Sequence, residues 1–226
     1  MLTPWDIGTL ESMLAAMVFA MALAFLLAQA ARKLPATLDD RHAGEPSIAH
    51  RRRRVGYCLA APLLAMACVH LLGATPLAVA VIVYVLMLLA LAWIDAETGL
   101  LPDMLSLPLL WLGLLVNIGG ALTSLQDAVL GAVAGYLVLW CVYWVFLIFT
   151  GREGMGYGDF KLLAALGAWL GWAALPWVLL VSSLSALAVA LVLRLAGRRS
   201  DGDTISFGPY LALAGVLMLF RLALAT

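Results

Sequence analysis

Gly151-Arg-Glu-Gly-Met-Gly-Tyr-Gly-Asp159 separates two long apolar runs of the chain and ends in an aspartate. The next apolar run follows directly, so the carboxylate of Asp159 stands at the edge of a hydrophobic segment. An ionised group loses hydration at such an edge, and acids placed there usually serve a function. Every second residue just before it is a glycine, namely Gly154, Gly156 and Gly158. The backbone there can therefore bend sharply and lie close to another chain.

A second acid, Asp95, closes an earlier apolar run that extends from Pro76 to Ile94. It belongs to the sequence Trp-Ile-Asp-Ala-Glu, which ends at Glu97. The two acids are far apart in the chain but have similar surroundings. Our central hypothesis is that Asp95 and Asp159 meet in space and share one proton.

The composition predicts an all-α, polytopic membrane protein. The chain has 226 residues, of which 65% are hydrophobic and 12% are charged, with a mean hydropathy of +1.06. The formal net charge is zero, which leaves no basic field for nucleic acid. The three cysteines lie in apolar runs without CxxC spacing, so we interpret them as packing residues and expect no metal site.

Hydropathy predicts about eight membrane spans, the sixth of them shorter than the roughly 20 residues that a span needs. The first has no basic region ahead of it, so we expect a membrane helix there and not a cleaved leader. A basic cytoplasmic loop with little fixed structure is expected at 32–54. The eight predicted spans are 7–30, 56–73, 76–94, 101–121, 125–149, 160–172, 175–195 and 208–225.

The basic residues predict the orientation of these spans. Of the 13 lysines and arginines, all but Arg221 fall on one side when the spans alternate. Cytoplasmic connections carry such an excess of positive charge. We therefore expect the N-terminus outside, and both Asp95 and Asp159 at the cytoplasmic face.

Two carboxyl groups that lie close together cannot both ionise readily, so they share a proton. Such a pair can activate a water molecule and protonate a departing amine, which is amide hydrolysis without a metal or a serine. The same acids also fit a proton-coupled transporter or a hydrogen bond between packed helices. Composition and topology leave these alternatives open.

Four blocks of sequence closely resemble the type IV prepilin peptidases, which are membrane aspartic proteases with a Gly-x-Gly-Asp motif. Residues 156–159 match that motif, and the resemblance covers about residues 76–220. The matching blocks are WIDAETGLLPD at 93–103, LPLLWLG at 107–113, GMGYGDFKLLAALGAW at 154–169 and FGPYLALAG at 207–215.

The resemblance implies an enzyme of the bacterial inner membrane that needs no cofactor. It implies that precursors of type IV pilins, or pseudopilins of type II secretion, are cut at the cytoplasmic face after the glycine that ends a short basic leader. The family's two catalytic acids match Asp95 and Asp159. Residues that the resemblance places in the motif or near the substrate are Gly156, Gly158, Glu97, Asp103, Lys161, Gly208 and Pro209.

The chain departs from many family members in one place. Those members carry a cytoplasmic domain with two CxxC pairs after the first span and also N-methylate the new terminus. Here that place, 32–54, holds no cysteine. We therefore expect a peptidase-only form, with the first span and basic loop at 1–55 and the peptidase domain at 56–226.

A third alternative function is a pilus-assembly platform that binds pilins without cutting them. This alternative gives no reason for two facing acids.

Overall fold

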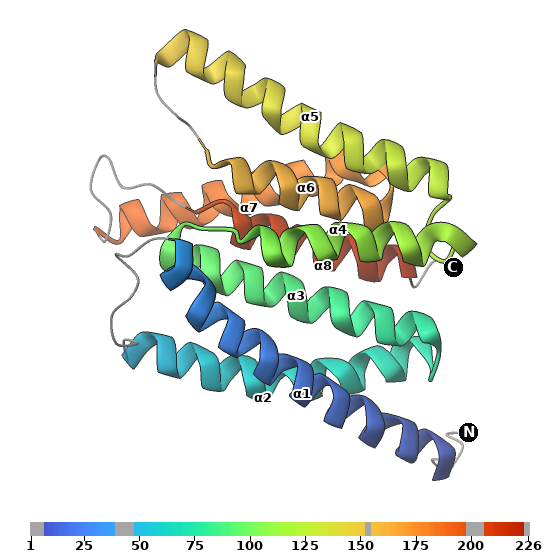
Figure 1. Cartoon of the computed structure of the whole chain (residues 1–226). Helices are drawn as coiled ribbons and strands as arrows, with labels where there is room; N and C mark the ends of the chain where they lie inside the picture. Colours follow the sequence, from blue (N-terminus) through green and yellow to red (C-terminus); the bar gives the residue numbers. More distant parts are fainter. Residues whose placement is uncertain (1–6, 39–47, 152–154, 198–205, 224–226) are drawn as a thin grey trace. The chain divides into compact units, whose positions relative to one another are not determined.

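The computed structural model describes residues 7–38, 48–151, 155–197 and 206–223, and the ordered elements in these ranges are all helical (Figure 1). Two 3-10 turns, η2 (Asn117–Gly119) and η3 (Trp172–Ala174), accompany the α-helices. The α-helices are α1 (Ile7–Leu38), α2 (Ile48–Leu72), α3 (Pro76–Thr98), α4 (Asp103–Val116), α5 (Leu125–Thr150), α6 (Tyr157–Leu170), α7 (Leu175–Leu195) and α8 (Gly208–Ala223).

These helices confirm the prediction of an all-α, polytopic membrane protein. Five contain a segment long and apolar enough to cross a bilayer, namely Glu11–Lys33, His50–Leu72, Pro76–Thr98, Leu125–Thr150 and Trp172–Leu195. Two shorter apolar segments, Asp103–Gly119 and Gly208–Leu222, accompany them. Each predicted span corresponds to one of the α-helices.

The prediction of a loop with little fixed structure at 32–54 is wrong for the residues of this range that the structure describes, because these are helical. Helix α1 continues to Leu38, and α2 already begins at Ile48 and includes Arg51 to Arg54. Arginine, lysine and alanine have high helix propensity. The polar residues that flank the two apolar spans therefore continue the helices and do not form a loop. The segment 39–47 lies outside the described residues.

The chain falls into two compact units, Met1–Trp93 and Ile94–Thr226. In the first unit, α1 and α2 pack together, and the hydroxyl of Tyr57 on α2 donates a hydrogen bond of 2.9 Å to the carbonyl oxygen of Leu86 on α3. The predicted division at residue 55, which separates a basic loop from a peptidase domain, stays a prediction.

Helix α6 forms the centre of the second unit. Its residues from Asp159 to Leu170 are buried except for Lys161, and it contacts α4, α5, α7 and α8. At 14 residues it measures about 21 Å, less than the thickness of a bilayer core. The sixth apolar run is therefore a short helix that is apolar almost all round, as expected for a helix packed among others.

Glycines allow α5 and α6 to approach each other closely. A Cβ atom added to Gly167 would meet the carbonyl oxygen of Gly131, and one added to Gly135 would lie 2.6 Å from the carbonyl oxygen of Leu163. Small residues four apart are typical of helix contacts within membranes. The buried amide of Asn117 adds hydrogen bonds of 2.9 and 3.1 Å to the carbonyl oxygens of Ala168 and Trp169.

Replacement of Gly167 by alanine is expected to lower the free energy of unfolding by about 1–3 kcal/mol, because the new methyl group forces two helix backbones apart. The midpoint of thermal unfolding in detergent measures this. Gly119→Ala is the matched control, because a Cβ atom there has no neighbour within 4 Å. Equal midpoints for the two variants would contradict the close contact between α5 and α6.

Candidate active site

Asp95 lies in the last turn of α3 and is 4% exposed. The helix stops shortly afterwards, because Gly99 adopts a φ of +66° that suits glycine. Gly208, the first residue of α8, donates its N–H to Oδ2 of Asp95 at 2.9 Å. The hydroxyl of Ser206 donates to the backbone carbonyl oxygen of Asp95, also at 2.9 Å. The start of α8 therefore holds both the side chain and the backbone of Asp95.

Asp159 lies in the first turn of α6, as expected for an acid near a helix N-terminus. Gly156 is the N-cap of this helix, and its carbonyl oxygen accepts the N–H of Asp159 at 3.2 Å. The side chain of Asp159 is buried, and its Oδ1 atom has no hydrogen-bond partner among the described residues. A buried carboxyl oxygen without a donor is costly unless the group is neutral or meets a ligand.

The structure brings Asp95 and Asp159 together in one open pocket of about 490 Å³ within the second unit. Helix α3 and the residues after it supply one wall, and the glycine-rich segment from Met155 onward supplies another. Ser206 and Phe207, just before α8, complete the lining. Two acids that are distant in the sequence thus face the same cavity.

The environment favours the neutral form of Asp159, which lies outside the five candidate spans. Burial, and then the negative charge of Asp95, raise the pKa of Asp159 to about 7. A hydrogen bond with the backbone of Gly156 acts in the opposite direction. On Asp95, the N–H of Gly208 stabilises negative charge at Oδ2, which offsets part of the cost of burying this carboxyl group.

The other site residues named from the sequence fall into two groups. Gly156, Gly158, Asp103 and Lys161 line the pocket with the two acids. Glu97 lies half-buried on α3, and Pro209 follows Gly208 in α8. Neither Glu97 nor Pro209 is among the described residues that line it. Gly154 of the glycine-rich loop lies outside the described residues.

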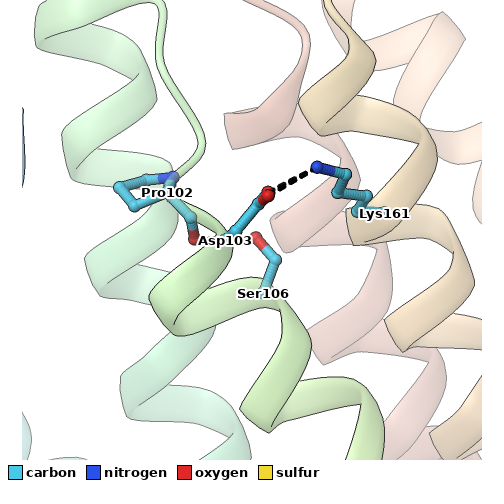
Figure 2. A network of polar contacts seen from close by, with 4 residues as sticks. All are labelled: Pro102, Asp103, Ser106 and Lys161. Carbon is cyan, nitrogen blue, oxygen red and sulfur yellow. Dashed lines mark hydrogen bonds and ion pairs between the residues drawn. The ribbon is translucent and has the colours of Figure 1, made fainter. Parts of the chain in front are cut away.

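Asp103 and Lys161, which both line the pocket, form an ion pair (Figure 2). Both carboxylate oxygens of Asp103, at the start of α4, lie 2.7 Å from Nζ of Lys161 on α6. Their side chains are 52% and 31% exposed, so the pair adds little to stability. Its effect is local, because it neutralises Lys161 and joins α4 to the helix that carries Asp159.

Two glycines of the motifs are required by close packing. A Cβ atom on Gly158 would lie 2.7 Å from Cβ of Leu101, and one on Gly208 would lie 2.6 Å from Oδ2 of Asp95. Any side chain at Gly208 would therefore displace the carboxylate of Asp95. The resemblance placed both glycines in the site, and the structure supplies this steric reason.

Ser206 and Leu101 were not singled out in the sequence. Ser206 reaches Asp95 across 111 positions, and no local pattern announces such a contact. Leu101 looks like any other residue of an apolar run. The glycines of α5, in contrast, could have been found from their spacing, since Gly131 and Gly135 stand four apart in an apolar segment.

Fold and pocket together define a polytopic α-helical membrane protein in which two acids face one cavity. Residues 82–191 match the type IV leader peptidase family. The chain is similar to this family over that region.

Relatives of known name are similar over the same region. A prepilin leader peptidase/N-methyltransferase of Aeromonas hydrophila is 61% identical over 132 residues, which are 58% of this chain and 46% of that protein. The protein of the same name from Burkholderia pseudomallei is 51% identical over 162 residues, or 72% of this chain and 52% of that protein. The chain thus spans about half the length of these curated relatives. No solved structure matches it. The apolar helices and the family fit a protein of the bacterial inner membrane.

Proposed function

We propose that this protein is a membrane aspartic endopeptidase that removes the leader of prepilins or pseudopilins. The observation that carries the proposal is the pocket shared by Asp95 and Asp159 within the domain of the leader peptidase family. The names of the relatives support the substrate class. Cleavage after the glycine that ends the leader follows from the family resemblance.

In the proposed reaction, Asp95 is the ionised acid and Asp159 holds the shared proton. The carboxylate of Asp95 takes a proton from a water molecule as the water oxygen bonds to the scissile carbonyl carbon. Asp159 donates its proton to the carbonyl oxygen, which relieves the negative charge that develops there. The C–N bond of the resulting gem-diol then breaks as Asp95 passes the proton that it took from water to the departing amine, and a hydroxyl of the diol returns its proton to Asp159, which restores the pair. The hydrogen bond from Gly208 to Asp95 and the absence of a donor to the buried Oδ1 of Asp159 among the described residues support this assignment.

We further propose that the pocket opens toward the cytoplasm and that the N-terminus lies outside. The distribution of lysine and arginine supports this orientation. No observation favours the transporter alternative, and neither relative described above is named as a transporter. A flux assay in proteoliposomes, with and without a proton gradient, separates the two functions.

The direct test of the proposed function is incubation of the purified protein with a candidate prepilin. Mass spectrometry then reads the new N-terminus of the product. The proposal predicts a single cut after the glycine that ends the leader. An intact prepilin, in a preparation whose helical content and unfolding midpoint show a folded enzyme, would contradict it.

Cleavage is expected to decline as the pH rises above about 7, because Asp159 then loses the shared proton. The sign follows from the raised pKa: the neutral form of Asp159 prevails below that value and the ionised form prevails above it. The measurement is kcat/KM for a prepilin peptide between about pH 5 and pH 9. Constant activity up to the alkaline end of this range would exclude a shared proton as a requirement.

No N-methylation of the cut pilin is expected. The relatives are named as methyltransferases as well, but 32–54 of this chain contains no cysteine for the CxxC pairs that the resemblance assigns to that activity. Incubation of enzyme and prepilin with S-adenosylmethionine, followed by the mass of the mature pilin, measures it. A product heavier by one methyl group would overturn the expectation of a peptidase-only form.

A further inference from the structure

A second pocket, of about 610 Å³, lies between α1 and α2 in the first unit. It extends from the end where α1 finishes and α2 begins, lined there by Arg32 and Arg51, to the apolar side chains of Phe25 and Leu59. Three arginines line it, Arg32 from α1 and Arg51 and Arg54 from α2. The match to the leader peptidase family begins only at residue 82, and neither acid of the proposed reaction lines this pocket.

The three arginines concentrate positive charge at this pocket. Arg51 and Arg54 stand three positions apart, which places them on one face of α2. Arg32 and Arg51 are exposed, and no carboxylate among the described residues pairs with any of the three. The guanidinium carbon of Arg54 lies 5.8 Å from the ring centroid of Phe25 on α1, a cation–π contact. A group of guanidinium ions at one pocket suits a phosphate, which accepts hydrogen bonds from several of them.

The same pocket also has an apolar wall, formed by Phe25, Val55 and Leu59. These side chains are 50%, 58% and 66% exposed, respectively. A free phosphate or a polar anion would leave this wall uncovered. A ligand with an anionic head and a hydrocarbon chain would use both parts.

Both helices that form the pocket are candidate membrane spans, over Glu11–Lys33 and His50–Leu72. The arginines lie at the polar ends of these segments, at the depth where lipid head groups are found. We propose that this pocket binds an anionic phospholipid of the bilayer. Its phosphate contacts Arg32, Arg51 and Arg54, and one acyl chain lies along Phe25, Val55 and Leu59.

The test uses the full chain, purified in detergent, with thermal unfolding followed as lipid is added. Phosphatidylglycerol is expected to raise the unfolding midpoint, whereas phosphatidylcholine with the same acyl chains is not. Glycerol 3-phosphate supplies the head group without chains and is expected to leave the midpoint unchanged. An equal shift with glycerol 3-phosphate would show an anion site instead of a lipid site. Equal shifts with the two phospholipids would overturn the anionic preference.

Variants of the arginines test whether the stabilisation by phosphatidylglycerol comes from this pocket. Arg51→Gln and Arg54→Gln are each expected to weaken the apparent affinity for phosphatidylglycerol about fivefold. Arg52→Gln is the matched control, because it removes the same charge from the same arginine run but Arg52 does not line the pocket. Equal weakening by Arg51→Gln and Arg52→Gln would show a general surface field and refute a pocket. Unfolding midpoints without lipid verify that each variant is folded.

Discussion

Replacement of either Asp95 or Asp159 by asparagine is expected to lower the rate of prepilin cleavage by about 10²- to 10⁴-fold. Asparagine keeps the size of the side chain but can neither take a proton from water nor return one to the amine. Both acids line one pocket, so each replacement removes half of the same pair. The rate of leader removal, followed by mass spectrometry, measures the effect.

The matched control for these variants is Glu11→Gln, which neutralises an exposed acid on α1 outside the pocket. It is expected to cut prepilin at the normal rate. Helical content should be unchanged in both aspartate variants, since asparagine keeps the packing of the side chain, and a cooperative unfolding transition verifies that each variant is folded. Normal cleavage by Asp95→Asn or Asp159→Asn would remove the acid pair from the mechanism.

The second large effect is expected from Gly208→Ala, with a loss of about 10²-fold in cleavage. The added methyl carbon would lie 2.6 Å from Oδ2 of Asp95, so either the carboxylate or the start of α8 has to move. Either shift breaks the 2.9 Å hydrogen bond that favours the ionised form of Asp95. A displacement of this size is enough to misplace a catalytic group.

Gly119→Ala serves as the control for Gly208→Ala, since a methyl group there meets open space. The pH dependence of the residual activity adds a second readout. If Gly208 positions Asp95 and stabilises its charge, the acid limb of the profile should differ from that of the wild type, because the hydrogen bond to Oδ2 is lost. An unchanged profile with full activity would show that the contact between α8 and α3 has no role in catalysis.

Much of the fold follows from hydropathy alone, because each apolar run of the sequence became one helix. Alternation of the spans predicted Asp95 and Asp159 on one side of the membrane, which agrees with the pocket that both acids line. Local patterns could not foresee that α6 is enclosed by its neighbours. That position depends on glycine contacts between α5 and α6, which are tertiary in origin.

The errors of prediction have physical causes. Arg51 to Arg54 looked like a loop because charge ends an apolar run, yet arginine has a high helix propensity and α2 includes all four. The hydrogen bonds that Ser206 and Gly208 donate to Asp95 could not be predicted, because these residues lie 111 and 113 positions from it in the chain. Such contacts are fixed by the packing of α8 beside α6 and leave no signature in either segment.

The central claim is that Asp95 and Asp159 share one proton, and infrared spectroscopy tests it without any substrate. The carbonyl stretch of protonated Asp159, identified by its loss in Asp159→Asn, is followed against pH in the wild type and in Asp95→Asn. Because the charge of Asp95 raises the pKa of Asp159, the account predicts a midpoint near 7 in the wild type and a lower one in Asp95→Asn. The same midpoint in both proteins would show that the two acids titrate independently, and would contradict the account.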